Sequence, residues 1–242
     1  MENDREFGRI MSQYQQLKQR AYRCNLELPE HKLVLYTFGN VSAIDRQAGV
    51  FAIKPSGVPY QELTPADMVV VDLDGNVIEG ELNPSSDTKT HAVLYRNFTE
   101  IGGIAHTHST YAVAWAQAVR SIPILGTTHA DHLQTEIPCT EVMSDAAIQG
   151  DYEEETGKQI VETFSKYSYQ KTPMVIAARH GPFSWGDTPE DAVYHSVILE
   201  ELARMALLTI QVDPDTTGLK PTLIEKHYQR KHGKDSYYGQ ES

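Results

Sequence analysis

A pair of histidines separated by one residue is the first feature of this sequence that could do chemistry. His106 and His108 end an apolar, glycine-containing run that begins at Ile101 and has the pattern of a β-strand. Because side chains alternate along a strand, both imidazoles leave one face and Thr107 leaves the other. Two imidazoles at this spacing can reach one Zn²⁺ ion at about 2.0–2.1 Å. Taken alone, such a pair is more often a pair of exposed or hydrogen-bonded strand histidines than a metal site.

Two more side chains extend this pair to a donor set for a transition metal. His180 ends a second apolar strand pattern, and Gly181-Pro182 after it predicts a sharp turn of the kind that lines a site. Asp87 lies at a predicted helix start, where capping the helix is the alternative role. Three histidines and one carboxylate suit a divalent transition-metal ion, and Zn²⁺ is the first candidate.

Two short segments have the composition of an anion site. Lys54-Pro55-Ser56-Gly57 combines a cation, a hydroxyl and a glycine that lets backbone N–H groups approach a ligand closely. Pro84-Ser85-Ser86 places two hydroxyls at a helix N-terminus, whose dipole favours phosphate. Ordinary turns with a helix cap are the alternative for both. The sequence contains neither GxGxxG nor the P-loop pattern, which disfavours a dinucleotide-binding or P-loop enzyme.

Two titratable groups outside these segments are candidates for proton transfer. Asp131, in Thr127-Thr128-His129-Ala130-Asp131, is either a base or a residue that caps a helix or pairs with a surface cation. Tyr238 follows Tyr237 near the end of a polar tail, where two aromatic rings are expected to cover something. Packing of the tail against a neighbour is the alternative.

Composition and charge restrict the partners. The chain has 242 residues, and 21 Lys and Arg against 33 Asp and Glu give a net charge of −12. This charge disfavours nucleic acid and anionic membranes, because both require clustered positive charge, whereas a few local donors can still hold one phosphate. No run is long and apolar enough to span a membrane, and the first residues lack a signal peptide's apolar region. Cys24 and Cys139 lie far apart, so we expect free thiols in a cytoplasmic protein.

Hydrophobic spacing predicts the elements that must position these residues in the first part of the chain. Residues 5–24 have apolar side chains three and four apart, which predicts an amphipathic helix. Short β-rich runs follow at 32–38, 49–54, 68–73 and 76–80. Asp74-Gly75 between the last two predicts a hairpin turn.

Helices and strands follow one another in the second part. We expect helices at 88–98, 110–119, within 144–168 and at 222–233, and strands at 101–108 and 173–178. Thr188 and Pro189 predict a further helix start, because Thr188 can cap and Pro189 fits the first turn. The buried stripe of that helix is predicted to be Tyr194, Ile198, Leu202 and Met205. Because several strands arrive without intervening helices, we predict an α/β fold, a single-domain α/β/α sandwich with a central largely antiparallel or mixed sheet.

The ordered combination of these segments resembles the class II aldolase/ribulose-phosphate epimerase family. The resemblance covers roughly residues 17–240 and rests on Gly39-Asn40-Val41-Ser42, Ile53-Lys54-Pro55-Ser56-Gly57, Pro84-Ser85-Ser86-Asp87-Thr88, Gly102-Gly103-Ile104-Ala105-His106-Thr107-His108-Ser109 and His180-Gly181-Pro182-Phe183. Two further segments narrow it to the branch of L-ribulose-5-phosphate 4-epimerases: Gly126-Thr127-Thr128-His129-Ala130-Asp131, and the ending from Lys231-His232-Gly233 to Tyr237-Tyr238-Gly239-Gln240. His132 and Arg179 depart from the pattern of that branch.

The resemblance implies a role for each matching residue. It implies a zinc ion, one per subunit, held by Asp87, His106, His108 and His180. It implies contacts to a phosphorylated pentulose from Gly39, Asn40, Lys54, Ser56, Gly57, Ser85 and Ser86. Asp131 and Tyr238 would be the acid/base pair, in homotetramers whose sites lie between subunits. The whole chain, 1–242, would be one domain, with an extra N-terminal segment at 1–16 and a tail at 234–242 that reaches an active site.

The activity that the resemblance implies is the C4 epimerisation of L-ribulose 5-phosphate to D-xylulose 5-phosphate. Cleavage and re-formation of the C3–C4 bond would invert C4, whereas oxidation and re-reduction would need a nicotinamide site that the sequence does not show. The main alternative is a class II aldolase that releases its fragments from a phosphorylated deoxyketose such as L-fuculose 1-phosphate. A zinc hydrolase and a catalytically inactive metal-binding assembly protein are further alternatives.

Overall fold

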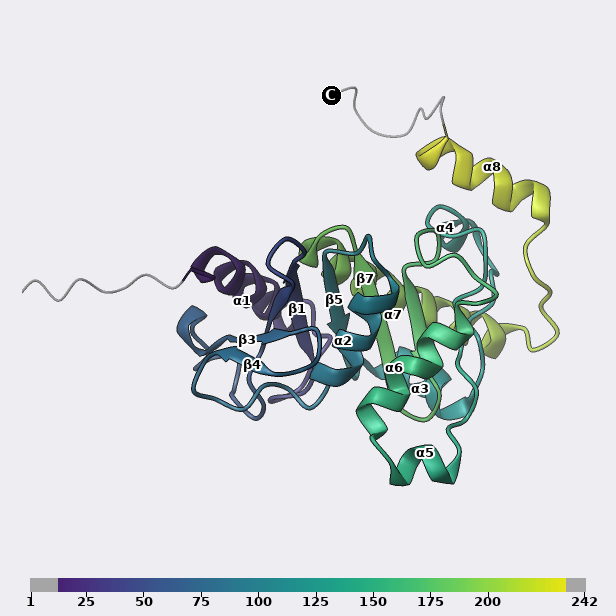
Figure 1. Ribbon diagram of the computed structural model, residues 1–242. Helices are drawn as coiled ribbons and strands as arrows, with labels where there is room; N and C mark the ends of the chain where they lie inside the picture. The colour runs from purple at the N-terminus through teal and green to yellow at the C-terminus, as the bar shows by residue number, and fades with distance from the viewer. Residues whose placement is uncertain (1–12, 234–242) are drawn as a thin grey trace, which may run out of the picture.

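The computed structural model describes residues 13–233, in which one sheet is covered by helices on both faces (Figure 1). Seven strands lie in the spatial order β4-β3-β2-β1-β5-β7-β6, and every neighbouring pair is antiparallel. The strands are β1 (Asn40–Asp45), β2 (Val50–Ile53), β3 (Val69–Asp72), β4 (Val77–Glu79), β5 (Gly103–His106), β6 (Met174–Ala177) and β7 (Gly181–Gly186). The predicted sandwich with a largely antiparallel sheet is confirmed.

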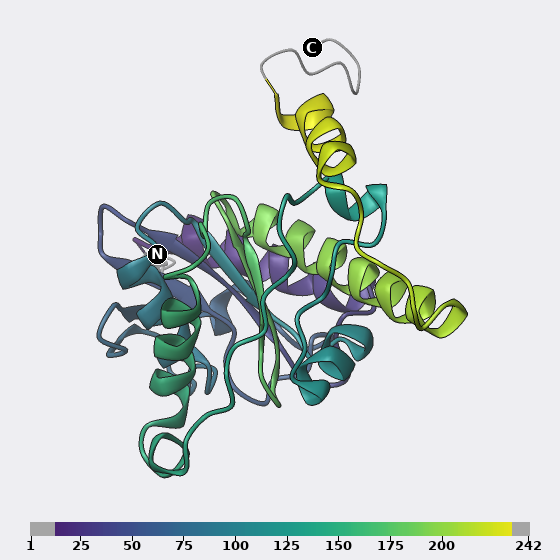
Figure 2. The ribbon, with the colours of Figure 1, turned by 90° about the vertical axis from the view of Figure 1, so that its right-hand side faces the viewer.

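Helices form the two outer layers, and Figure 2 shows α6 and α7 on opposite sides of the sheet. The helices are α1 (Gln15–Glu30), α2 (Thr88–Asn97), α3 (Thr110–Ala118), α4 (Thr127–Ala130), α5 (Asp145–Gln149), α6 (Tyr152–Thr163), α7 (Pro189–Val212) and α8 (Pro221–His232), with the 3-10 turn η1 at Pro65–Asp67. Helices α2 and α6 pack on one face, and α1 and α7 cover the other. Helix α8 projects from the body and packs beside α4.

The alternation of side chains along β2 explains how the sheet is buried on both faces. Phe51 and Ile53 lie in the core on the side of α2, whereas Val50 and Ala52 lie in the core on the side of α1. Because both faces of the strand are covered, the run is apolar at every position rather than at alternate positions. The hairpin turn predicted at Asp74-Gly75 is confirmed between β3 and β4.

The predicted β-rich run at 32–38 is wrong. This segment consists of turns and irregular backbone, and Lys32 and Tyr36 have φ values of 60° and 51°. A left-handed residue interrupts an extended chain, so the run cannot continue as a strand. The strand of this region is β1, whose polar Asn40, Ser42 and Asp45 obscure an apolar strand pattern.

Strands around the histidines also differ from the prediction. β5 ends at His106, so His108 lies in the connection that follows rather than within the strand. His180 lies in the turn between β6 and β7, and β7 is an additional strand that is buried along its length. The sharp turn at Gly181-Pro182 is therefore the start of a strand, which the apolar alternation did not reveal.

The start of α7 is confirmed, but its predicted buried stripe is only partly correct. Thr188 caps the helix by accepting a hydrogen bond from the Asp191 amide, and Pro189 follows. Leu202 is buried, whereas Tyr194 is 51% and Met205 is 38% exposed. The helix instead buries the face that carries Ala192, Val193, Ser196, Leu199, Leu202, Ala203 and Ala206. Small residues on this face let α7 approach the sheet closely.

The remaining expectations fall in part outside the described residues. The helix predicted at 5–24 is confirmed from Gln15 and continues to Glu30, while residues 1–12 are not described. Tyr237 and Tyr238 also lie outside the described range. Cys24 and Cys139 are free thiols, as expected. Within residues 13–233, no helix is both long enough and apolar enough to cross a membrane.

Candidate active site

The predicted metal and phosphate residues line one cavity of about 390 Å³. It lies where β1 begins and where β2 and β5 end, and the loop before α2 and the turn before β7 approach it. The predicted residues that line it are Gly39, Asn40, Lys54, Ser56, Gly57, Ser85, Ser86, Asp87, His106, His108 and His180. Segments that are separated in the sequence therefore meet at one place, which we call the histidine cavity.

Three imidazoles converge at the base of the histidine cavity. The ligand nitrogens of His106, His108 and His180 lie within 4.8 Å of one another. The Nε2 atoms of His106 and His108 are 3.1 Å apart, and the ring centroids of His106 and His180 are 4.7 Å apart. These distances place three nitrogen donors around one small space, which a single metal ion can occupy.

The environment keeps these imidazoles ready to act as ligands. His106 donates Nδ1–H to the carbonyl of Pro182 at 2.9 Å, which leaves its Nε2 lone pair for a metal. Burial, followed by electrostatic repulsion from the neighbouring His106 imidazole, lowers the pKa of His180 to about 3. Burial also lowers the pKa of His108. Neutral imidazoles are the form that binds metals, so His108 and His180 need no proton release to bind a metal near neutral pH.

Asp87 supplies the carboxylate of the cluster. Its Oδ2 lies 4.0 Å from Nε2 of His106 and accepts a hydrogen bond of 2.7 Å from Asn40 Nδ2. Burial opposes its ionisation, but the nearby imidazoles and the Asn40 hydrogen bond outweigh burial, so its pKa lies below the ordinary value. Although Asp87 occupies the N-cap position of α2, its side chain makes no capping hydrogen bond. The carboxylate is directed to the cavity instead.

This donor set fits a zinc ion. Three imidazole nitrogens and one carboxylate oxygen are usual zinc ligands, and four donors satisfy its tetrahedral preference. The buried Nδ1 of His180 has no hydrogen-bond partner among the described residues. A buried polar atom needs a partner, and a metal ion bound by this group of donors would provide one.

Phosphate donors lie in the same cavity. Lys54 is 1% exposed, and burial lowers its pKa to about 8. Within residues 13–233 no carboxylate pairs with it; its Nζ approaches the carbonyls of Thr37 and Pro55 at 3.4 and 3.3 Å and lies 4.9 Å from the Tyr60 ring centroid. A buried ammonium without a carboxylate favours an anionic ligand, because a ligand charge would offset the cost of burial.

The two predicted anion segments are held side by side by backbone hydrogen bonds. The Ser85 amide donates to the Lys54 carbonyl at 3.0 Å, and the Ser56 amide donates to the Asn83 carbonyl at 2.9 Å. Gly39 closes the cavity from the other side with a φ of 74°. A Cβ there would lie 2.8 Å from the His106 carbonyl oxygen, so only glycine permits this close approach.

Several residues of the site were not predicted. Thr37 and Phe38 also line the histidine cavity, and the Phe38 ring lies 5.9 Å from that of His108. Tyr60 donates to the carbonyl of Phe38 at 2.8 Å and supports this loop. His91, one turn after Asp87, is fully buried, and burial lowers its pKa to about 3. The spacing Asp87-x-x-x-His91 was the one available signal, because residues four apart share a helix face.

Asp131 has a different environment from the cavity residues. It follows α4 and accepts hydrogen bonds from Arg230 Nη2 at 2.7 Å and from His227 Nδ1 at 2.9 Å. Burial opposes its ionisation, but these hydrogen bonds outweigh burial and lower its pKa. Asp131 is not among the described residues that line the histidine cavity. Its predicted catalytic role and that of Tyr238 therefore stay predictions.

The two departures noted in the sequence also lie outside the histidine cavity. Arg179 donates to the Gln117 carbonyl, which holds its side chain against the end of α3. His132 lies on a separate cavity of about 670 Å³ that His195 and His232 also line. Neither side chain reaches the predicted metal or phosphate groups in this chain.

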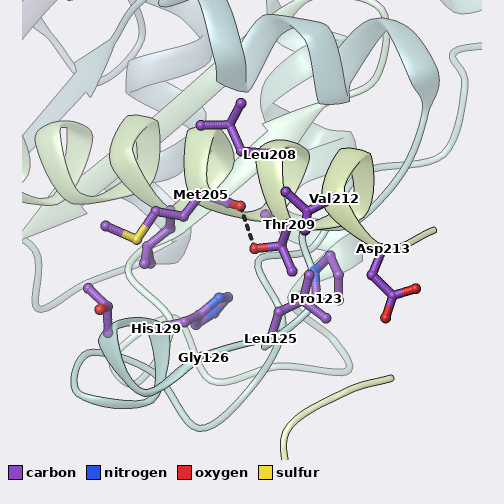
Figure 3. A pocket seen from close by; sticks show the side chains of 12 residues that line it. Pro123, Leu125, Gly126, His129, Met205, Leu208, Thr209, Val212 and Asp213 are labelled. Atoms are coloured by element: carbon purple, nitrogen blue, oxygen red, sulfur yellow. Dashed lines mark hydrogen bonds between the residues drawn. The ribbon is translucent and has the colours of Figure 1, made fainter. Parts of the chain in front are cut away.

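A further groove of about 460 Å³ lies between α4 and the second half of α7 (Figure 3). Apolar side chains such as Met205, Leu208 and Val212 form much of it. His129 faces it, but its Nε2 hydrogen-bonds to the Thr135 carbonyl at 3.1 Å, and burial lowers its pKa to about 4. The imidazole is thus neutral and tied to its own loop, so His129 supports α4.

Comparison with known proteins places the histidine cavity in a family context. A model of the class II aldolase and adducin N-terminal domain matches residues 19–207, which include every residue that lines this cavity. Helix α8, with the partners of Asp131, lies beyond the matched residues.

Solved structures share this fold. An L-fuculose 1-phosphate aldolase superposes with a TM-score of 0.74 at 26% identity, over 89% of this chain and 95% of that chain. YgbL of Escherichia coli, a candidate aldolase/epimerase/decarboxylase, has a TM-score of 0.69 at 21% identity, over 88% and 98%. L-Fuculose-1-phosphate aldolase from Thermus thermophilus has a TM-score of 0.61 at 24% identity, over 84% and 98%. The last two likenesses establish the shared fold.

Proposed function

The chain belongs to the class II aldolase and adducin N-terminal domain family, and we propose that it is a zinc-dependent L-ribulose-5-phosphate 4-epimerase. The family carries out metal-dependent aldolase and epimerase chemistry on sugar phosphates. One observation supports the proposal most strongly. The cluster of three histidines shares a cavity with Asp87, with two serine-containing segments and with a buried Lys54 that has no carboxylate partner among the described residues. Such a cavity can hold the keto end of a sugar beside its phosphate.

The reaction determines which groups the site needs. The C4 hydrogen of L-ribulose 5-phosphate is not adjacent to the C2 ketone, so removing it would not give a stabilised anion. Cleavage of the C3–C4 bond instead passes its electron pair to the three-carbon fragment, while the C4 hydroxyl loses its proton and C4 becomes an aldehyde. Rotation of that aldehyde and re-formation of the bond inverts C4. The zinc ion, held by Asp87, His106, His108 and His180, would supply Lewis-acid stabilisation of the developing negative charge.

The phosphate side of the cavity would prevent loss of the cleaved fragment. Lys54 would donate a charge-assisted hydrogen bond, and Ser56, Ser85 and Ser86 would add hydroxyl and backbone donors to the phosphate. Gly57 would let the backbone approach it. The phosphate of L-ribulose 5-phosphate is on the aldehyde fragment. These contacts would therefore hold glycolaldehyde phosphate while its aldehyde group rotates.

A second subunit would supply the proton-transfer groups. Apart from the proposed metal ligands, the described residues of the histidine cavity include no carboxylate, imidazole or phenol. Asp131 is paired with α8 of its own chain, so we assign Asp131 and Tyr238 to the cavity of an adjacent subunit in a homotetramer. General acid/base help of this kind contributes about 10²- to 10⁴-fold to a rate.

Complementation between inactive subunits tests this shared site. His106→Asn and Tyr238→Phe chains should each be nearly inactive alone. When they are refolded together, interfaces that pair an intact metal cluster with an intact Tyr238 should recover an appreciable fraction of wild-type turnover. Mixed tetramers without any recovery would contradict the shared site.

An L-fuculose-1-phosphate aldolase is the second candidate, because a protein of that name superposes on 89% of this chain at 26% identity. Both reactions break a C3–C4 bond, but the aldolase releases its two fragments. The deciding experiment incubates the zinc-loaded protein with each sugar phosphate and quantifies D-xylulose 5-phosphate, glycolaldehyde phosphate and dihydroxyacetone phosphate. Conversion of L-ribulose 5-phosphate without free glycolaldehyde phosphate supports the epimerase. Cleavage of L-fuculose 1-phosphate alone supports the aldolase and refutes the epimerase.

A further inference from the structure

Asn40 lies where the proposed metal ligands meet the proposed phosphate residues. It begins β1 and is paired directly with His106 of β5 in the antiparallel register. Directly opposed residues of neighbouring strands leave the same face of a sheet, so these two side chains are neighbours. Asn40 is 2% exposed and lines the histidine cavity. The sheet therefore fixes Asn40 beside a proposed metal ligand.

The amide nitrogen of Asn40 is directed to the segment before α2. It donates to Asp87 Oδ2 at 2.7 Å and to Ser85 Oγ at 3.0 Å. The reverse orientation of the amide would place its oxygen at that shorter distance from a carboxylate oxygen, and two acceptors repel each other. The hydrogen bonds therefore assign the nitrogen, and not the oxygen, to Asp87.

This hydrogen bond reaches the carboxylate oxygen that faces the metal donors. Oδ2 of Asp87, which accepts it, is also the atom that lies 4.0 Å from Nε2 of His106. The Asp87 side chain makes no capping bond to α2, and Ser85 Oγ approaches the same oxygen at 3.5 Å. Among the described residues, Asn40 thus supplies the shorter of the two hydrogen bonds to this carboxylate. Without Asn40, the long contact to Ser85 would be the main restraint on rotation of the carboxylate.

The family resemblance implies that Asn40 contacts the phosphorylated sugar, but its surroundings indicate a different role. The nitrogen bonds to two protein groups, and the amide oxygen is buried without a hydrogen-bond partner among the described residues. A hydrogen bond from Asn40 to a ligand would therefore compete with those to Asp87 and Ser85. The two roles differ in what they affect: a sugar contact affects the KM, whereas a contact to Asp87 affects the affinity for the metal.

We propose that Asn40 is a positioning residue that orients the Asp87 carboxylate for metal binding through the hydrogen bond from its amide nitrogen. The proposal rests on the metal site of the proposed function, but not on the identity of the sugar. Carboxylates that bind metals are in turn hydrogen-bonded, and loss of such a partner typically weakens metal binding by about 10- to 100-fold. Because Ser85 accepts from the same nitrogen, Asn40 also joins the metal carboxylate to the phosphate segment.

Zinc affinity, measured by competition with a chromophoric chelator, tests this role without any assay of activity. We expect Asn40→Ala to bind Zn²⁺ about 10- to 100-fold more weakly than the wild type. Asn25→Ala is the matched control, because Asn25 is also buried and its amide bonds to the backbone of Val41, the next residue of β1. This control should bind Zn²⁺ within about threefold of the wild type. The visible spectrum of bound Co²⁺ should change in Asn40→Ala and not in Asn25→Ala.

A double-mutant cycle shows whether Asn40 acts through Asp87. Asp87→Ala removes the group that Asn40 is proposed to orient. Adding Asn40→Ala to Asp87→Ala should therefore weaken zinc binding by no more than about a further twofold. Asn40→Ser, whose shorter side chain does not reach the carboxylate, gives the same comparison if Asn40→Ala does not fold.

The possible outcomes separate this role from the proposed function. Equal zinc affinity of the wild type and Asn40→Ala overturns this proposal alone, and a rise only in the KM for L-ribulose 5-phosphate would then make Asn40 a substrate contact. If Asn40→Ala weakens zinc binding by the same factor with and without Asp87, Asn40 acts independently of the carboxylate and the proposal fails. A wild type that binds no Zn²⁺ overturns the metal site as well.

Discussion

The histidine cavity and the surroundings of Asp131 differ in whether their charged and polar groups already have partners. In the cavity, imidazoles with lowered pKa values face one another. Within the described residues, the buried Lys54 lacks a carboxylate partner, and the buried Nδ1 of His180 has no hydrogen bond. Around Asp131, by contrast, Arg230 and His227 both hydrogen-bond to the carboxylate. The cavity is arranged for a ligand, whereas Asp131 already has its partners.

The difference bears on what each region can do within one chain. Unpaired donors and acceptors in a buried site are costly unless a metal or an anion completes them. A carboxylate that is held ionised by cations is a poor base until those cations are displaced or shared. Asp131 therefore anchors α8 in the single chain, and its proposed catalytic role depends on an adjacent subunit.

Metal removal should give the largest effect on the histidine cavity. We expect dialysis against a strong chelator, or His108→Ala, to lower turnover by about 10³-fold or more, since Lewis-acid stabilisation is worth several kcal/mol. Zn²⁺, Co²⁺ or Mn²⁺ should restore the dialysed wild type but not the variant. Metal analysis and turnover are measured together, with the exposed His31→Ala as the control. Full activity in a metal-free preparation would refute the site.

Replacing Asp131 should give the next largest effect and separates its two roles. Asp131→Asn should lower epimerase turnover by about 10²- to 10⁴-fold with unchanged metal content, because proton transfer is lost but no ligand is removed. Arg230→Gln keeps the carboxylate and loosens α8, so its loss of turnover should be much smaller. If the two variants lose activity equally, Asp131 is an anchor for α8 rather than an acid or base.

Two glycines should show how differently the two regions are packed. A Cβ on Gly103, in β5 of the histidine cavity, would lie 2.2 Å from the Pro189 Cα, so we expect Gly103→Ala to cost about 4 kcal/mol or more. A Cβ on Gly126, before α4, meets nothing within 4 Å, so Gly126→Ala should change stability by no more than about 1 kcal/mol. Urea unfolding measures both. Equal midpoints would contradict the packing difference.

The smallest effect that we expect is the contribution of His129 to the pH dependence of the free energy of unfolding. Its folded-state pKa of about 4 lies below the ordinary value of about 6.5, because the ring is buried. Above pH 6.5 both states are neutral; between pH 6.5 and 4 the unfolded state binds a proton that the folded state does not. The free energy of unfolding should therefore fall as the pH falls through this window, by up to about 1.4 kcal/mol per unit for this group.

A pair of variants checks this assignment. His129→Gln should reduce the slope of the unfolding free energy between about pH 6.5 and 4.5. His31→Gln replaces an exposed histidine at the end of α1 and should leave the slope unchanged. Identical slopes for the wild type and His129→Gln would show that burial of His129 does not contribute.

The sequence alone determined the parts of the molecule that depend on local spacing. The histidine pair, the Lys54 and Ser85 segments, the capped start of α7 and the helix α2 follow from residue types within a few positions. The same local rules failed at 32–38, where left-handed backbone replaces a strand, and at β1 and β7, whose polar residues and glycines obscure the alternation. Family resemblance, not spacing, joined the separated residues into one site.

Only the tertiary structure decided which of those residues meet. The order of the strands places β1 beside β5 and β5 beside β7, which brings Asn40, His106 and the turn of His180 together. The hydrogen bonds of Ser42 to His91 and Tyr95, and those of Asp131 to α8, join residues from 49 to 101 positions apart. Periodicity describes which face of one helix or strand is buried, but the pairing of faces depends on the packing of the whole sheet and its helices.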